Sequence, residues 1–193
     1  YAAYFEVYEG HLQSIVDFLL SECMGDGGFN CYSNSNTVHP VHSSMHSTIS
    51  VLEGFLEYST KHYRYRLSDI QKSVQAAQQF LLEHKLFRSH RTGEIIDKKM
   101  LMLSYPSRWK YDTLRALDYF RLSGVKYDSR MQDALDILVS KRREDGRWLV
   151  QSKHLGQTHF DMEKTGKPSR WNTLRALRVL QHFGVDTHAT AKG

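Results

Sequence analysis

Three side chains that could act on a substrate alternate in one short stretch of the sequence. His159, Asp161 and Glu163 are two residues apart, so an extended loop would place them on one side. Together with Asp112 or Glu94 on the opposite side of a predicted cavity, these side chains could supply the acid and the base for hydrolysis of a glycosidic bond. The alternative interpretation is that they are solvated loop residues, as charged side chains in loops usually are.

A repeated tetrapeptide provides a second set of candidates. Pro-Ser-Arg-Trp occurs at residues 106–109 and 168–171, and each copy leads into a similar predicted helix. A helical projection places a polar stripe beside the apolar face, and arginines near a helix N-terminus can bind carboxylate or phosphate. The candidate ligand-binding residues are therefore Arg108, Trp109, Asp112, Arg115, Tyr119, Arg170, Trp171, Asn172, Arg175 and, from a more diverged copy, His46; the catalytic candidates are Asp112, Arg115, His159 and Asp161.

Each of these side chains also has a purely structural interpretation. Arg115 and Arg175 could pair with carboxylates and tie neighbouring hairpins together, as repeat-encoded ion pairs often do. Trp109, Trp148 and Trp171 would then be core and hairpin-packing residues, because aromatic side chains at helical spacing usually are. The alternative is that one of them stacks on a sugar or an isoprenoid.

The stretch between residues 31 and 46 is the weak candidate for a metal site. It contains Cys31, His39, His42 and His46, and the last two would point the same way if a helix carried both. Zinc is the metal that suits these ligands, and the alternative is solvated histidines. No other cofactor can be predicted from the sequence.

The elements that would position these residues form three helical pairs. Apolar residues at helical spacing predict first helices at 12–23, 67–86 and 131–141. Second helices carry Thr48, Thr113 and Thr173 at equivalent places, and an Asp-Gly turn followed by an aromatic residue ends the first helix of the first and third pairs. We therefore expect one all-α domain over residues 1–193, with hairpins at 9–63, 67–125 and 128–185.

The order of first helix, Asp-Gly-aromatic turn, loop and second helix resembles that of the α/α-toroid superfamily of terpenoid (squalene) cyclases and protein prenyltransferase β-subunits. Residues 26–29 and 145–148 are similar to degenerate forms of the repeat Gln/Asp-Gly-x-Trp of squalene cyclases. The resemblance implies a toroid-like partial barrel whose inner helices face a central polar cavity. The Asp-x-Asp-Asp run of class II cyclases is missing, and so is the zinc-binding Asp-x-Cys pair of prenyltransferases.

Composition narrows the range of partners. The 193 residues carry a formal net charge of +5, but Lys and Arg are scattered among 21 acidic residues, so we expect no nucleic-acid partner. No apolar run is long enough to cross a bilayer, and two cysteines fit a reducing, cytoplasmic setting. Because the sequence begins at Tyr1, we expect it to be part of a longer chain, whose remainder could be a partner.

Two classes of function follow. The first is an enzyme that acts on an anionic or amphiphilic substrate, either an isoprenoid diphosphate or an acidic polysaccharide, with Arg115 or Arg175 and His159 as in a polysaccharide lyase. The second is a binding or scaffolding module without chemistry. The two predict different surfaces: a deep pocket for the enzyme and a shallow apolar face for the module.

Overall fold

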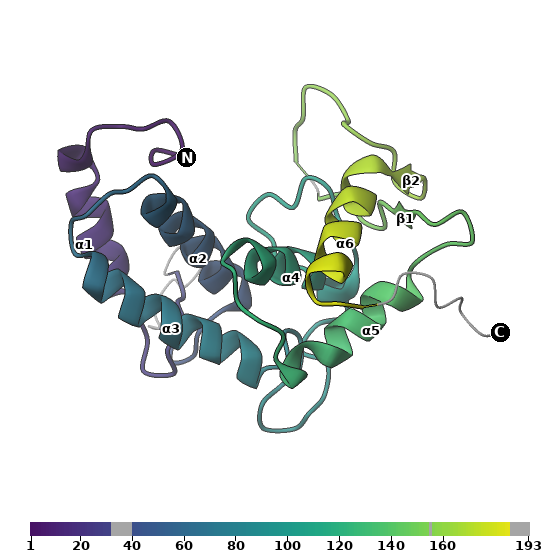
Figure 1. Cartoon of the computed structure of the whole chain (residues 1–193), viewed down its shortest axis with the longest axis horizontal. Coiled ribbons are helices and arrows are strands. Elements are labelled where there is room, and N and C mark those ends of the chain that lie inside the picture. The colour runs from purple at the N-terminus through teal and green to yellow at the C-terminus, as the bar shows by residue number, and fades with distance from the viewer. Residues whose placement is uncertain (32–39, 155, 186–193) are drawn as a thin grey trace. The chain divides into compact units, whose positions relative to one another are not determined.

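The chain is mainly α-helical. A computed structural model describes residues 1–31, 40–154 and 156–185. Within them lie six α-helices and a two-stranded antiparallel sheet in which Trp148 pairs with Ser169 (Figure 1). In chain order the elements are α1 (Gln13–Ser21), α2 (Met45–Thr60), α3 (Leu67–Glu83), α4 (Thr113–Leu122), α5 (Gln132–Ser140), β1 (Trp148–Leu149), β2 (Pro168–Ser169) and α6 (Arg170–His182).

These elements confirm the six predicted helices and the mainly α fold class. The chain forms two compact units, Tyr1–Leu82 and Glu83–Gly193, here called the N-terminal and C-terminal units. The boundary lies at the end of α3, inside the predicted second hairpin. The single-domain organisation, the hairpin array and the toroid stay predictions.

The Asp-Gly turns adopt the predicted geometry in both units. Gly27 has a φ of +87° and Gly146 a φ of +76°, a region that residues with a Cβ rarely occupy. Each turn returns an aromatic side chain to the core, and Phe29 and Trp148 are both fully buried. In both copies of the turn, a glycine therefore reverses the direction of the chain, and burial of the aromatic ring stabilises the turn.

The repeated threonines hold those aromatic residues from the side of the second helix. The Oγ1 of Thr48 accepts a hydrogen bond from the backbone N–H of Phe29 at 3.0 Å, and the Oγ1 of Thr173 accepts one from Trp148 at 3.1 Å. Because a buried N–H without an acceptor costs free energy, the threonine satisfies a group that the turn would otherwise leave unpaired. The first and third predicted hairpins therefore share this threonine–backbone hydrogen bond.

The two Pro-Ser-Arg-Trp copies have different structures. Ser169 lies four residues before Thr173 and caps α6, accepting a hydrogen bond from the N–H of Asn172 at 2.8 Å. Ser107 lies six residues before Thr113, too far to cap the equivalent turn, and Asp112 caps α4 instead. The prediction that one helix carries both Arg108 and Asp112 in a polar stripe is therefore wrong, because α4 begins after both residues.

The C-terminal unit packs around α4, which contacts both α5 and α6. Leu114, Leu117 and Phe120 of α4 are fully buried, as is Trp148 from the adjoining turn. The other two tryptophans are exposed, with 62% of Trp109 and 40% of Trp171 accessible to solvent, so the prediction that they are core residues is wrong. Trp109 precedes α4, and Trp171 lies in the first turn of α6, where the helix faces outward.

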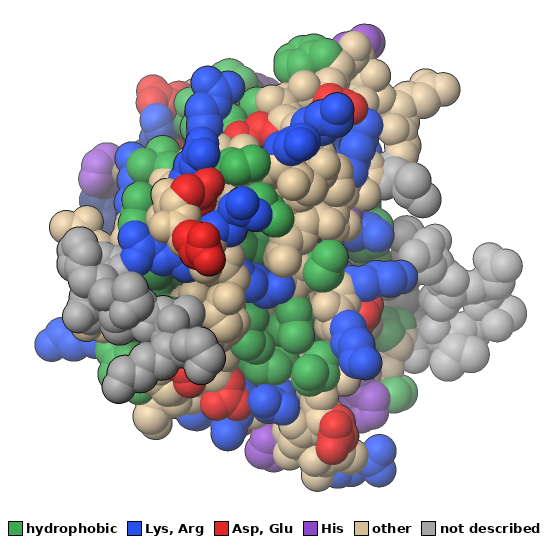
Figure 2. All heavy atoms as spheres, turned by 90° about the vertical axis from the view of Figure 1, so that its right-hand side faces the viewer, with side chains coloured by type: hydrophobic (Ala, Val, Ile, Leu, Met, Phe, Trp, Pro, Cys, Tyr) green, Lys and Arg blue, Asp and Glu red, His purple; other side chains and the backbone are tan. Residues whose placement is uncertain are grey.

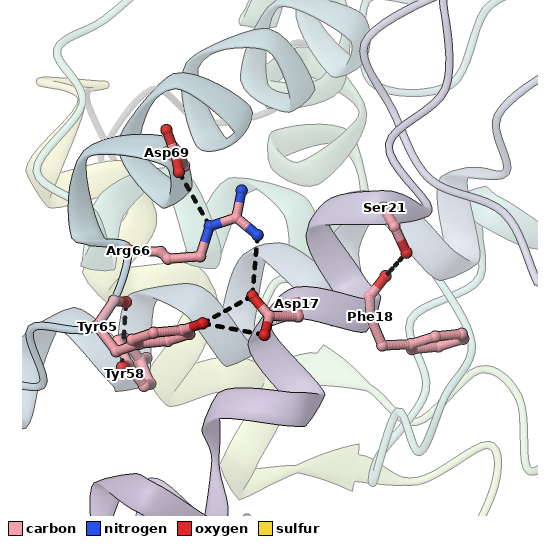
Figure 3. Close-up of polar contacts among 7 residues, drawn as sticks. All are labelled: Asp17, Phe18, Ser21, Tyr58, Tyr65, Arg66 and Asp69. Carbon is pink, nitrogen blue, oxygen red and sulfur yellow. Dashed lines mark hydrogen bonds and ion pairs between the residues drawn. The ribbon is translucent and has the colours of Figure 1, made fainter.

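A polar network connects α1 to the start of α3 in the N-terminal unit (Figure 3). The hydroxyl of Tyr65 donates to Asp17, and Nη1 of Arg66 lies 2.9 Å from the same carboxylate. The Nε of Arg66 also lies 3.0 Å from Asp69, within the first turn of α3. These side chains are largely solvent-exposed, so each ion pair contributes little free energy and the network mainly fixes where α3 begins.

The hydrogen bond between Thr48 and Phe29 generates a stability prediction. Replacing Thr48 with Val keeps the shape but leaves the buried N–H without this acceptor, which should lower the free energy of unfolding by about 1–3 kcal/mol. The matched control is Thr60→Val, whose exposed hydroxyl bonds only to Leu56 within α2 and whose change should stay within about 0.5 kcal/mol. Urea denaturation monitored by circular dichroism measures both values. Equal losses in the two variants would contradict the proposed role.

Candidate functional site

A pocket of about 270 Å³ opens on the C-terminal unit. It brings together Arg108, His159, Asp161 and Glu163, which the sequence singles out, and His154, which it does not. Two segments form the wall, one before α4 and one between β1 and β2. The lining residues are Tyr105, Pro106, Arg108, Val150, Lys153, His154, Thr158, His159, Phe160, Asp161, Met162 and Glu163.

Backbone pairing at the base of the pocket holds the two segments side by side. The N–H of Gln151 donates to the carbonyl of Leu103 at 2.8 Å, and the Oε1 of Gln151 accepts from the N–H of Leu103 at 3.1 Å. Ser104 and Ser152 form a parallel bridge next to this pair. Leu103 and Val150 are both buried, so the core anchors each segment, and Val150 also forms part of the pocket wall.

A chain of hydrogen bonds runs from the pocket wall into the core. The Nε2 of His154 lies 3.0 Å from the Oγ of Ser104, and that hydroxyl lies 3.1 Å from the Oδ2 of Asp112. Ser104 is 2% exposed and Asp112 1% exposed, whereas His154 is half-buried and lines the pocket. The carboxylate also caps α4, because its Oδ1 accepts from the N–H of Arg115 at 2.8 Å.

Burial shifts the pKa values at both ends of this chain. Loss of solvent raises the pKa of the Asp112 carboxyl, although the charge of Arg175 and the backbone N–H groups of Arg115 and Ser104 act in the opposite direction. Burial also lowers the pKa of His154, and the positive charge of Lys110 adds to that effect. A neutral imidazole at the wall of a pocket can accept a proton near neutral pH.

The predicted loop carboxylates line the pocket but have structural partners. Asp161 forms an ion pair with Lys153. Glu163 accepts hydrogen bonds from the hydroxyl of Ser169 and, at 2.7 Å, from the N–H of Arg170, so it stabilises the N-terminus of α6. Glu94, considered as their counterpart, lies in a separate turn and is not part of the pocket wall.

Two of the predicted ligand-binding residues, Arg115 and Arg175, do not line the pocket. The Nε of Arg175 lies 3.0 Å from Asp118 on α4, and both side chains are largely buried. Arg115 donates from Nη1 to the carbonyl of Lys110 at 2.7 Å. The ion pair of Arg175 matches the structural alternative, because it ties α6 to α4, whereas Arg115 bonds to a backbone carbonyl just before its own helix. That both arginines bind a ligand stays a prediction.

The remaining predicted ligand-binding residues divide between the core and the surface. Tyr119 and Asn172 are buried, and the Nδ2 of Asn172 donates to the carbonyl of Leu149 at 3.1 Å. Arg170 is exposed in the first turn of α6. His46 belongs to the N-terminal unit, in the first turn of α2, so its predicted place beside the others stays a prediction.

Aromatic side chains form part of the pocket wall. Tyr105 stacks on Trp171 with ring centroids 5.3 Å apart and an interplanar angle of 10°. Phe160 is also part of the wall and is mostly exposed. The site therefore places flat apolar rings beside the cationic side chains of Arg108 and Lys153.

The weak metal candidate loses its geometric basis. Helix α2 begins at Met45, so His42 lies outside it and the expectation that a helix aligns His42 with His46 is wrong. Cys31 is exposed, and His39 lies outside the described residues. Among the residues that the structure describes, no three His, Cys, Asp or Glu side chains are grouped closely enough to hold a metal ion.

The surface carries charges of both signs. Figure 2 shows Lys and Arg side chains spread over one face, with acidic and apolar side chains among them. Across residues 1–31, 40–154 and 156–185, no helix has the length and apolar character needed to cross a membrane.

The chain matches no protein-family model, and no curated protein or solved structure matches it either. The resemblance to the α/α-toroid superfamily therefore stays a prediction. The chemistry of the pocket has to be inferred from its own geometry.

Sequence reasoning missed Ser104 and His154. They are 50 positions apart, and neither belongs to a motif. Only the pairing of the segments around Leu103 and Gln151 brings them together. Asp112 was singled out as a candidate, but for a position on a helical face and not for its bond to Ser104.

The lowered pKa of His154 predicts a pH dependence of stability. Between that lowered pKa and the ordinary value of 6.5, the unfolded chain binds more protons at this residue than the folded chain does. The contribution of His154 to the free energy of unfolding should therefore decline as the pH falls below 6.5. Urea denaturation from pH 7.5 to 5 should show a shallower decline for His154→Gln than for the unmodified protein. A parallel decline in both would contradict the assignment.

Proposed function

We propose that the C-terminal unit binds an acidic sugar in this pocket and that His154 removes a proton from it. The observation that carries the proposal is the hydrogen-bonded chain from His154 through Ser104 to Asp112. A base whose orientation is fixed by a second and a third group is the usual arrangement of acid–base sites. The buried end of the chain supplies that orientation.

The rest of the wall supports an anionic, ring-shaped ligand. The guanidinium of Arg108 can donate two parallel hydrogen bonds to a carboxylate. Tyr105 and Phe160 offer flat surfaces on which a sugar ring can stack. A sugar acid combines these two properties in one molecule.

The reaction that fits these groups is a β-elimination. His154 takes the proton from the carbon next to the carboxylate, and the C–H electron pair forms a carbon–carbon double bond. The bond from the neighbouring carbon to the glycosidic oxygen breaks, and that oxygen takes a proton from water. Arg108 stabilises the negative charge that develops on the carboxylate.

Hydrolysis by a carboxylate pair is the less favoured reaction. It needs one carboxyl group as acid and another as base or nucleophile. In this pocket Asp161 is paired with Lys153, and Glu163 caps α6. Glu163 cannot leave its partners without loosening the N-terminus of α6, so the pocket lacks a second carboxylate that is available for the reaction.

We also propose that the three hairpins form a partial toroid of the squalene cyclase and prenyltransferase type. The equivalent bonds of Thr48 and Thr173 support a repeated hairpin. Cyclase and prenyltransferase chemistry is not part of this proposal, because their catalytic motifs are missing. The alternative function is a binding or scaffolding module without chemistry, which is predicted to use a shallow apolar face and to show no turnover.

Turnover of acidic oligosaccharides tests the proposal. The expected product contains a conjugated carboxylate, which is detected by ultraviolet absorbance. His154→Gln should reduce kcat about 100-fold or more, because it removes the general base. Arg108→Gln should raise KM about tenfold, because a charge-assisted hydrogen bond to the substrate is lost, and it should also lower kcat, because the developing negative charge is no longer stabilised.

Two matched controls change the same residue types elsewhere. His42→Gln alters an exposed histidine of the N-terminal unit, and Arg91→Gln alters an exposed arginine outside the pocket wall. Both should keep the kinetics of the unmodified protein. Calorimetric binding of acidic sugars without turnover would favour the binding module, and the absence of both binding and turnover would overturn the proposal.

A further inference from the structure

The hydroxyl of Ser104 has two polar partners but only one hydrogen to donate. Its Oγ lies 3.1 Å from the Oδ2 of Asp112 and 3.0 Å from the Nε2 of His154. If the hydroxyl donates to one of them, it must accept from the other. The direction of these two bonds therefore decides which ring nitrogen of His154 carries the proton.

The surroundings of Asp112 fix that direction. Its Oδ1 accepts from the N–H of Arg115 at 2.8 Å, and the positive charge of Arg175 on α6 acts on the carboxylate, while that of Arg115 acts on the adjacent Tyr111. The other charged groups around the chain are Lys110 and Arg108, which face His154, and Tyr111 is the titratable neighbour of the carboxylate. Burial raises the pKa of this carboxyl, and these donors and the positive charge counteract that effect and favour an ionised carboxylate, which can only accept hydrogen bonds.

We infer that Ser104 is a positioning residue that holds His154 in the tautomer with the proton on Nε2. The ionised Asp112 accepts the only hydroxyl hydrogen of Ser104, so the serine oxygen accepts from Nε2–H. The lone pair of the neutral imidazole then lies on Nδ1, which becomes the proton acceptor of the site. The catalytic use of Nδ1 rests on the proposed function, whereas the tautomer itself does not.

The same geometry predicts the effect of replacing the Asp112 carboxylate, which caps α4, with a neutral amide. In an Asp112→Asn variant, the amide oxygen is needed to accept from the N–H of Arg115, so the amide nitrogen faces Ser104. That nitrogen can only donate, and the serine hydroxyl must then donate to Nε2 of His154. Loss of one charge should therefore move the proton of the neutral ring from Nε2 to Nδ1.

Nuclear magnetic resonance of the full chain with ¹⁵N-labelled histidine tests the inference. Long-range ¹H–¹⁵N spectra distinguish the two tautomers, and His154→Gln assigns the signals of this ring. At neutral pH the unmodified protein should show Nε2–H. Ser104→Ala should produce a mixture of tautomers, Ser104→Thr should retain Nε2–H because it keeps the hydroxyl, and Asp112→Asn should show Nδ1–H.

The signals of the exposed His159 serve as the control, because it lines the same pocket without belonging to the chain. Nδ1–H in the unmodified protein, or unchanged Nε2–H in Ser104→Ala, would overturn the inference. Retained Nε2–H in folded Asp112→Asn would show that the carboxylate does not set the direction. If Asp112→Asn does not fold, the alanine and threonine variants of Ser104 decide the question. None of these spectra requires turnover, so failure of the proposed function gives a different pattern of results.

Discussion

The buried carboxylate of Asp112 is the constraint on which the C-terminal unit depends. It is almost inaccessible to solvent, so its charge has to be compensated by nearby donors. It meets that need in two directions, toward the N-terminus of α4 through Arg115 and toward the preceding segment through Ser104. The side chain of Asp112 therefore both caps α4 and holds the segment that leads into the pocket wall.

The same arrangement explains why the pocket forms beside the second predicted hairpin. Near the third hairpin, Ser169 caps α6 and Pro168 pairs with Leu149, so the chain between the strand and the helix is short and regular. Before α4, Asp112 is the cap, and Tyr105, Pro106 and Arg108 line the pocket. Two extra residues between the tryptophan and the threonine therefore place the first Pro-Ser-Arg-Trp copy outside the helix cap and partly in the pocket wall.

An enzyme and a binding module would require different groups in the pocket wall. A binding module needs only the stacked rings and the cations of the pocket. A proton-transfer site also needs a base with a defined acceptor atom, and the bonds among His154, Ser104 and Asp112 meet that demand. In a binding module the same two hydrogen bonds would only fix the position of His154.

The helices, the glycine turns and the equivalence of Thr48 with Thr173 can be predicted from the sequence, because each depends on contacts within one hairpin or on local backbone preference. The spacing of His159, Asp161 and Glu163 also predicts that they share one side of a loop, and all three line the pocket. The ion pair of Arg175 with Asp118, the exposure of Trp109 and the contact of His154 with Ser104 emerge only in the folded chain. Spacing along the chain reports which side chains share a helix face. The pairing of segments 50 residues apart is set by core packing, which no local pattern records.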